Sequence, residues 1–300
     1  MLPTFLIFNP RSGAGKNIKL VPHVIAHFKA KNIPFEYRVT TGPDDARKIA
    51  SQVKNTFDII VAAGGDGTVN EVVNGIGGSN CILGILPLGS GNDFARTMRY
   101  PRHINECLQV LSEQQIRTID LGLIEVVNSN SEKKKKYFIN SVGIGLDAQV
   151  ASEAGRINWI RGLPKYSIAA LNVVFGYQAE SSVVSSADFE STGKHLLISV
   201  GNGKSSGGGF YLTPDALVND GLLDVCMAKN LTMLDVLKIF PFVFAGKHGR
   251  FGKIEMKRAK KLLVRADADL PVHVDGEVIG LNIREVLVEI LPAAIKVIAA

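Results

Sequence analysis

The chain has 300 residues, of which 46% are hydrophobic and 21% are charged, and 30 are glycine. At about 150 residues per domain, this length predicts two domains. The composition excludes a disordered chain, a collagen-like repeat and a small disulfide-stapled scaffold. Cys81, Cys107 and Cys226 are widely spaced and lack metal-site spacing, so we expect buried thiols in a reducing compartment.

The net charge of +6 is concentrated in one segment. Residues 247–265 hold eight Lys and Arg and one Glu, so the rest of the chain carries 26 minus 27, or −1. Nucleic acid, an anionic membrane surface and a polyphosphate substrate are all compatible with this local basicity. The chain has no signal-peptide pattern and no run of about 18 apolar residues, which predicts a cytoplasmic protein.

The first 125 or so residues alternate strand and helix patterns. The expected strands are 5–8, 35–40, 58–63 and 82–87, and the expected helical segments are 18–31, 44–53, 71–76, 93–98 and 104–112. This rhythm predicts an α/β domain, a parallel sheet covered by helices on both faces.

The remainder is rich in strand patterns without regular helical crossovers. Strands are expected at 116–127, 136–142, 195–201, 222–227, 261–265, 272–274 and 285–291, and a helix at 165–177. These short strands predict an antiparallel second domain, a sandwich or barrel. A further helix is expected within Leu234–Phe251, broken near Pro241.

Two glycine-rich turns each follow a buried strand and open a helix. The first is Gly64-Gly65-Asp66-Gly67-Thr68-Val69-Asn70, and the second is Gly89-Ser90-Gly91-Asn92-Asp93. Glycines allow close backbone approach, and N–H groups at a helix start favour an anion such as phosphate. Beside polyphosphate, Asp66 makes chemical sense if it acts through Mg²⁺. An ordinary glycine turn with an Asp cap is the alternative for either turn alone, and the pair at one sheet edge favours a ligand site.

A third glycine turn, Asn9 to Lys16, does not form a Walker A motif. Pro10 stands where that motif needs Gly, and Asn17 replaces its Ser or Thr. Whether Lys16 touches phosphate stays open. A dinucleotide fingerprint is absent from the sequence as well.

Acids in glycine turns also occur in the second half. They are Asp147 in Gly143–Asp147, Asp220 in Asn219–Gly221, and Asp275 with Glu277 in Val274–Glu277. Asp-Gly is a common hairpin turn, which explains any one of them structurally. Near an ATP site, such an acid could accept the proton of an acceptor hydroxyl.

Taken as a series, these motifs resemble the bacterial diacylglycerol kinase-like lipid kinases, the soluble type related to sphingosine kinases. The series is Gly64–Gly75, Pro87–Arg96, Gly201–Gly203, Gly207–Gly209, Asn219–Asp224 and Asp275–Glu277, and it covers essentially the whole chain. Ser90 is a departure, because the family more often has Thr there. The resemblance implies an NAD-kinase-like α/β domain at 1–125, a β-sandwich domain at 126–283, and a segment 284–300 returning to the first.

The resemblance also implies residue roles. ATP would be bound by Gly64, Gly65, Asp66, Gly67, Thr68, Val69 and Asn70, helped by Thr40 and Ser90. The catalytic base would be Asp275, with Glu277, Asp120 and Asp66 in a carboxylate–water–metal network. A structural Mg²⁺ would be held by the Asp220 carboxylate and the carbonyls of Leu217 and Leu222. The implied reaction is ATP-dependent phosphorylation of a membrane lipid hydroxyl, that of diacylglycerol or a related glycerolipid.

Two alternatives are kept. NAD kinases share the Gly-Gly-Asp-Gly-Thr loop, although the Pro87–Phe94 run favours the lipid-kinase branch. A catalytically silent nucleotide-binding regulator that docks on membranes is the non-enzyme hypothesis.

Leu234–Phe251 leads into the basic segment, so it is either a core-packed helix or a contact with anionic lipid at the inner membrane surface. No nucleic-acid partner is expected, because no recognised motif accompanies the charge. The oligomeric state is open, a homodimer included.

Overall fold

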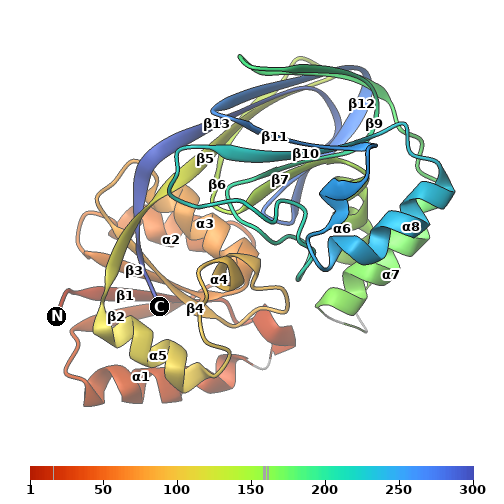
Figure 1. Cartoon of the computed structure of the whole chain (residues 1–300). Coiled ribbons are helices and arrows are strands. Elements are labelled where there is room, and N and C mark those ends of the chain that lie inside the picture. The colour runs from red at the N-terminus through yellow and green to blue at the C-terminus, as the bar shows by residue number, and fades with distance from the viewer. Residues whose placement is uncertain (16, 158–159, 161) are drawn as a thin grey trace. The chain divides into compact units, whose positions relative to one another are not determined.

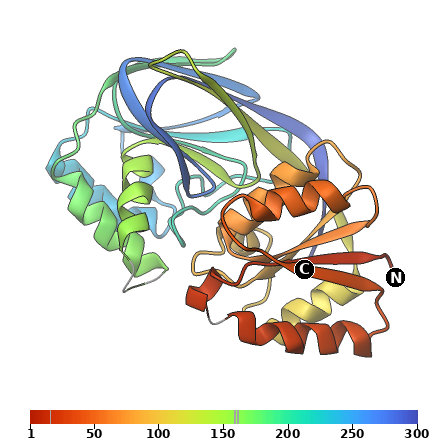
Figure 2. The same cartoon turned by 180° about the vertical axis from the view of Figure 1, so that it is seen from behind.

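The computed structural model describes residues 1–15, 17–157, 160 and 162–300. The chain divides into two compact units (Figures 1 and 2). Unit 1 is Met1–Ile119 together with Ala293–Ala300, and unit 2 is Asp120–Pro292. None of the helices in the described part of the chain is long and apolar enough to cross a membrane.

Unit 1 alternates strands and helices. Its elements are β1 (Thr4–Phe8), two 3₁₀ turns (Ser12–Gly15 and Asn17–Leu20), α1 (Val21–Ala30), β2 (Phe35–Val39), α2 (Asp45–Val53), β3 (Ile59–Gly64), α3 (Asp66–Ile76), β4 (Ile82–Pro87), α4 (Asp93–Thr97) and α5 (Ile104–Glu113). Strand β1 pairs in parallel with β2 and β3, and β3 pairs in parallel with β4. Beyond β4, Lys296 and Val297 at the end of β13 (Glu277–Ile298) add a further parallel pairing.

Helices cover both faces of the unit 1 sheet, α1 and α5 on one and α2 and α3 on the other (Figures 1 and 2). Because side chains alternate along a strand, Leu6 and Phe8 of β1 point to the same face. There they pack in one core with Phe28 of α1 and Leu108 of α5. This packing holds the sheet and leaves the loops after β2, β3 and β4 at its carboxyl edge.

Unit 2 is rich in antiparallel strands. Its elements are β5 (Ile116–Asn128), β6 (Lys133–Phe138), β7 (Ser141–Gly145), α6 (Leu146–Arg156), α7 (Leu163–Val174), β8 (Ser181–Ser185), β9 (Glu190–Gly201), β10 (Leu223–Lys229), α8 (Met233–Val243), a 3₁₀ turn (His248–Arg250), β11 (Ile254–Ala259), β12 (Lys261–Val274) and most of β13. The ladders β5–β6, β7–β9, β7–β12, β8–β9, β8–β12, β9–β10, β10–β11 and β12–β13 are all antiparallel. An α/β N-terminal domain followed by a β-rich C-terminal domain agrees with the expected class, while the two-layer sandwich stays a prediction.

Two local expectations for unit 2 were wrong. Helix α6 begins at Leu146, directly after β7, where the sequence suggested only a glycine turn. Helix α8 runs through Pro241 and ends at Val243 instead of breaking at the proline.

Candidate active site: two glycine turns and a hairpin acid

The first glycine turn joins β3 to α3. Gly65 is the extended residue before the helix, with φ −96°, and Asp66 is the first helical residue. A Cβ on Gly64 would lie 2.2 Å from the Thr68 Oγ1, so this glycine makes room for the threonine side chain. Thr68 Oγ1 in turn accepts a hydrogen bond of 2.9 Å from the Asn9 Nδ2. The helix therefore starts at a fixed position at the end of β3, where its N–H groups favour an anion.

The second glycine turn, which follows β4, touches the first. A Cβ on Gly89 would lie 2.4 Å from the Gly65 Cα, so the two turns approach each other through glycine backbone. The Asn92 Oδ1 accepts the Gly89 N–H at 2.9 Å, and Asn92 has a φ of 52° that asparagine tolerates. The Asp66 Oδ1 accepts the Phe94 N–H at 3.2 Å, so this carboxylate also braces the start of α4. Predicted residue Ser90 is exposed at the tip of this turn.

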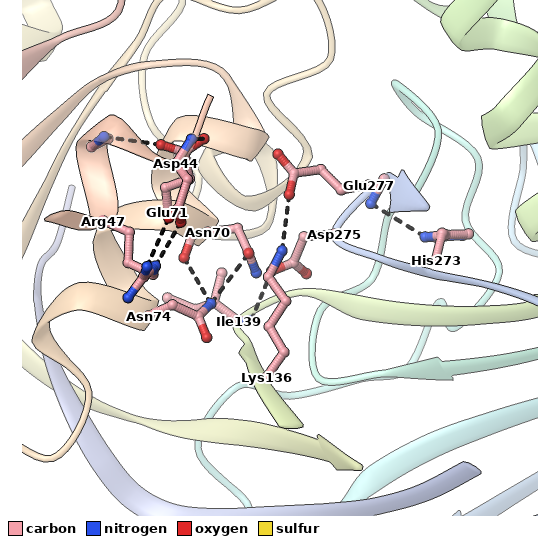
Figure 3. Close-up of polar contacts among 12 residues, drawn as sticks. Asp44, Arg47, Asn70, Glu71, Asn74, Lys136, Ile139, His273, Asp275 and Glu277 are labelled. Carbon is pink, nitrogen blue, oxygen red and sulfur yellow. Dashed lines mark hydrogen bonds and ion pairs between the residues drawn. The ribbon is translucent and has the colours of Figure 1, made fainter. Parts of the chain in front are cut away.

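Thr40 follows β2 and is buried at the same carboxyl edge of the sheet. Its N–H donates to the Phe8 carbonyl at 2.8 Å. The next helix, α2, is held by Glu71 of α3, whose two carboxylate oxygens accept the Asp44 and Ala46 N–H groups at 2.9 and 3.0 Å (Figure 3). The predicted nucleotide residues of unit 1 thus follow β2, β3 and β4, at the same edge of one sheet. Lys16 lies outside the described residues.

Sequence reasoning missed the supporting roles of two residues in this region, Asn9 and Glu71. Their side chains hold Thr68 and the start of α2. An Asn directly after a strand is a common turn residue, so the sequence offered only a weak signal for Asn9. Asn92 belongs to the second glycine turn that the sequence singled out, and its side chain holds the Gly89 N–H.

In unit 2, Asp275 and Gly276 form the tight turn of the β12–β13 hairpin. Val274 pairs with Glu277 across it, and both turn residues have positive φ, 47° and 84°, as a type I′ turn requires. The Asp275 carboxylate accepts the main-chain N–H groups of Ile139, Asn140 and Ser141 at 2.9–3.0 Å. Figure 3 shows this carboxylate beside Ile139. Asp275 therefore ties the hairpin to the start of β7.

Glu277 is the residue directly after this turn. Its carboxylate contacts the Lys136 Nζ at 2.9 Å, and its side chain is 41% exposed. Figure 3 shows the two side chains pointing toward each other. Of the two acids in the Asp-Gly-Glu sequence, Glu277 has the more accessible carboxylate.

Asp120 and the loop that precedes β10 are bound together. The Asp120 Oδ2 accepts the Gly221 N–H at 2.7 Å, and the Asp120 N–H donates to the Val218 carbonyl at 2.7 Å. Asp120 is buried, whereas Asp220 is exposed and its Oδ1 accepts the Leu222 N–H at 3.1 Å. Asp120 thereby fixes the loop from which the predicted metal ligands project.

The donors expected for a structural metal fit Mg²⁺ by their chemistry. One carboxylate, that of Asp220, and two carbonyls, those of Leu217 and Leu222, form an all-oxygen set that hard cations prefer. No group of three or more His, Cys, Asp or Glu side chains in the described part of the chain could hold a metal ion. A site here would therefore rely on main-chain oxygens and water.

An apolar cavity of about 130 Å³ lies in unit 2. Helices α6, α7 and α8 and strands β9 and β10 line it, with Leu146, Leu171, Leu196, Val236 and Leu237 among the wall residues. Cys226 and His248 also face it, and both are buried. Burial raises the pKa of the Cys226 thiol to about 12, with a further contribution from the charge of Asp147. Burial also lowers the pKa of His248, against the opposing bond to the Leu212 carbonyl, so both wall residues are uncharged at neutral pH.

The cavity is flanked by exposed leucines. Leu171 of α7 and Leu237 of α8 line the cavity and are each 46% exposed. Phe175, at the end of α7, and Leu234, at the start of α8, are 68% and 78% exposed. An apolar cavity beside exposed apolar side chains suits a ligand with an aliphatic chain.

These features define a class of protein. Its first unit is an α/β domain with two glycine turns at the carboxyl edge of its sheet, and its second is a β-rich domain with an Asp-Gly-Glu hairpin and an apolar cavity. Residues 3–124 match the diacylglycerol kinase catalytic domain, and residues 140–299 match the YegS C-terminal NAD kinase beta sandwich-like domain.

Relatives and solved structures agree with these matches. The chain is 31% identical over 272 residues to a diacylglycerol kinase of Mycobacterium tuberculosis, covering 90% of this chain and 86% of that protein. It is 30% identical over 300 residues to a probable lipid kinase YegS-like of Yersinia enterocolitica, covering 98% and 95%. The chain belongs to this diacylglycerol kinase and YegS-like family and is a lipid kinase.

The fold itself is similar to solved structures. A putative diacylglycerol kinase from Bacillus anthracis aligns with a TM-score of 0.81 at 23% identity, covering 99% of this chain and 97% of the other. Yeast NADH kinase complexed with NADH aligns with a TM-score of 0.51 at 11% identity, covering 100% and 84%. Both similarities concern the fold alone.

Proposed function

We propose that this protein transfers the γ-phosphate of ATP to the hydroxyl of a membrane lipid, diacylglycerol or a related glycerolipid. The apolar cavity of unit 2 is the observation that carries the choice of a lipid acceptor. The cavity is walled mostly by apolar side chains, leucines and valines among them, with uncharged Cys226 and His248 and one acid, Asp147. Such a wall suits an acyl chain and offers few partners to a polar acceptor.

ATP is proposed to bind at the glycine turns of unit 1. Gly64–Asn70 would present helix-start N–H groups to the phosphates, and Thr40 and Ser90 would flank them. The close approach of Gly65 and Gly89 supports this assignment, because it brings the two glycine turns together at the carboxyl edge of the sheet. Asp66 would face the phosphates through Mg²⁺, which neutralises their charge when it is bound.

Glu277 is proposed to accept the proton of the lipid hydroxyl. The family resemblance implied Asp275 for this role, with Glu277 in the network beside it. We favour Glu277 because its carboxylate is the more accessible, whereas both Asp275 oxygens accept main-chain N–H groups. The hydroxyl oxygen attacks the γ-phosphorus, the bond to the β–γ bridging oxygen breaks, ADP leaves and the proton passes to Glu277. Lys136, at 2.9 Å, would hold the Glu277 carboxylate in place before the transfer.

Asp120 and Asp220 are proposed to support the acceptor side. Asp220, with the carbonyls of Leu217 and Leu222, would hold a structural Mg²⁺, and Asp120 anchors their loop. The carboxylate–water–metal network of Asp66, Asp120, Asp275 and Glu277 remains part of this proposal.

The protein is proposed to act from the cytoplasm at the inner membrane surface. The exposed Leu234 and Leu237 of α8 are followed by Lys238, Lys247 and Arg250. An apolar surface bordered by Lys and Arg suits an anionic bilayer, from which the lipid acceptor would come.

The test is phosphate transfer by the purified full chain. Labelled ATP and Mg²⁺ are supplied with diacylglycerol in mixed micelles, or with NAD, which the likeness to NADH kinase makes the matched rival. We expect label in the lipid, none in NAD, and a loss of about a hundredfold or more in the Glu277→Gln variant. Label in NAD alone would overturn the proposed lipid acceptor. Unchanged turnover in Glu277→Gln would overturn the assignment of Glu277 as the base.

A further inference from the structure

His273 lies directly behind the Asp-Gly-Glu hairpin. It belongs to β12, two residues before Asp275, and it is 1% exposed. The Gly276 N–H donates to the His273 Nδ1 at 3.2 Å, a contact drawn in Figure 3. Because an amide donates to Nδ1, that nitrogen carries the lone pair, and the ring proton of the neutral imidazole is on Nε2. The ring therefore bonds the turn from inside the protein.

The other ring nitrogen faces Asp147. The His273 Nε2 lies 3.2 Å from the Asp147 Oδ2, at the first turn of α6. This contact is close but lacks the alignment of a hydrogen bond, and the Asp147 Oδ2 is buried with no hydrogen-bond partner in the described structure. Asp147 also lines the apolar cavity. Asp147 thus lines the cavity and also contacts the His273 imidazole, which bonds the Asp275–Gly276 turn.

Gly143 shows that the surrounding sheet makes room for this pair. It stands opposite His273 in the β7–β12 ladder. A Cβ at this position would lie 2.2 Å from the His273 Nε2 and 2.3 Å from the Asp147 Oδ2. Any larger residue would push the imidazole or the carboxylate away, so the glycine is required where the two side chains meet.

We propose that His273, oriented by Asp147, is a positioning residue that fixes the Gly276 amide and thereby the carboxylate of Glu277. The expected effect of His273 on turnover rests on the proposed lipid-kinase function. Its expected effect on the conformation of the turn rests on the hairpin geometry alone. Glu277 is the next residue after Gly276, so a rotation of that peptide displaces the Glu277 side chain directly. A displacement of about 1 Å in a catalytic group can cost about a hundredfold in rate.

Two variants distinguish the effect of the hydrogen bond between His273 and the turn from the effect of the size of the His273 side chain. His273→Asn keeps an acceptor oxygen close to the position of Nδ1, whereas His273→Leu keeps a similar shape without an acceptor. We expect kcat to fall about tenfold to a hundredfold in His273→Leu, with the KM for ATP unchanged, and to recover substantially in His273→Asn. His195→Asn is the control, because His195 is buried in unit 2 but bonds Ser182 and Ser191 instead of the turn.

Amide hydrogen exchange of the segment 273–279 tests the positioning without any turnover. We expect faster exchange at Gly276 in His273→Leu than in wild type, and near wild-type exchange in His273→Asn and His195→Asn. Equal exchange in wild type and His273→Leu overturns the inference, whatever the activity. If exchange changes as expected but wild type transfers phosphate to no lipid, the positioning stands and the proposed function fails.

Discussion

Asp275 combines a left-handed backbone with a carboxylate that binds the main chain of another segment. Its φ of 47° suits the hairpin turn, and its oxygens accept three main-chain N–H groups at 2.9–3.0 Å. Asparagine tolerates this backbone but offers one acceptor oxygen, so Asp275→Asn leaves a buried N–H unpaired. We expect a loss of about 1–3 kcal/mol in the free energy of unfolding, measured by urea denaturation.

The matched control for Asp275→Asn is Asp267→Asn, at an exposed position of β12. It should leave the unfolding midpoint unchanged. Glu277→Gln should show the opposite profile to Asp275→Asn, with turnover lost and stability kept, because its carboxylate is half exposed. An Asp275→Asn protein as stable as wild type contradicts the structural role assigned to this residue.

The sequence predicted where the glycine turns lie but not what each glycine does. A glycine run after a buried strand is a local pattern, so Gly64–Asn70 and Gly89–Asp93 could be placed at one sheet edge. The reason for Gly89 is a contact with Gly65, a residue of another loop, and such approaches appear only when the sheet is assembled. The same holds for the structural role of the Asp275 carboxylate, which depends on the amides of Ile139–Ser141.

Among the elements, α8 presents apolar side chains to solvent at its start. Leu234 is 78% exposed and Leu237 is 46% exposed, whereas Phe240 and Phe244 pack against Phe210. If the helix contacts lipid, a charge at its most exposed leucine must weaken that contact. We expect Leu234→Glu to reduce binding to vesicles that contain phosphatidylglycerol, measured by cosedimentation.

Leu281→Glu is the control for this helix, since Leu281 is 53% exposed on β13. It should bind vesicles as wild type does. Added salt should weaken wild-type binding, because Lys and Arg near an anionic surface contribute about 1 kcal/mol each. Equal binding by all three proteins, insensitive to salt, would count against a membrane contact through α8.

Strand β9 carries a buried histidine that makes unit 2 sensitive to acid. His195 bonds Ser182 and Ser191, and burial, followed by the charge of Lys229, lowers its pKa below the usual 6.5. The unfolded chain therefore binds a proton more readily than the folded one, so stability falls as the pH drops below about 6.5. Thermal unfolding across this pH range should show a shallower decline in His195→Asn than in wild type. Parallel declines would mean that other groups set the acid sensitivity.

Helix α6 shows why part of unit 2 could not be predicted. Its buried residues are largely small, including Ala148, Ala151 and Ala154, so its apolar periodicity is weak. The preceding Gly-Ile-Gly-Leu-Asp stretch has the composition of a turn. Packing of α6 against α7 and against β12 stabilises the helix, and those contacts come from distant parts of the chain.

At the scale of the whole molecule, each ligand is assigned to a different unit, so binding of the two should be separable by mutation. In unit 1, Gly89→Ala places a Cβ 2.4 Å from the Gly65 Cα and should distort the proposed ATP site. In unit 2, Ala170→Phe fills the apolar cavity that Ala170 lines. Saturation at about 100 times the Kd raises the free energy of unfolding by about 2.7 kcal/mol, so thermal shifts report ATP binding without turnover.

We expect Gly89→Ala to lose the thermal shift caused by Mg-ATP, and Ala170→Phe to keep it while losing phosphate transfer to diacylglycerol. Gly42→Ala is the control in unit 1, because a Cβ there meets nothing within 4 Å. If Ala170→Phe also lost the thermal shift caused by Mg-ATP, the cavity would bind the nucleotide or stabilise the chain, and the lipid acceptor would bind at another site. If it kept both the shift and full transfer, the acyl chain does not enter this cavity. If an aliphatic acceptor binds in the cavity of unit 2, Ala170→Phe must retain the thermal shift caused by Mg-ATP and lose phosphate transfer to diacylglycerol.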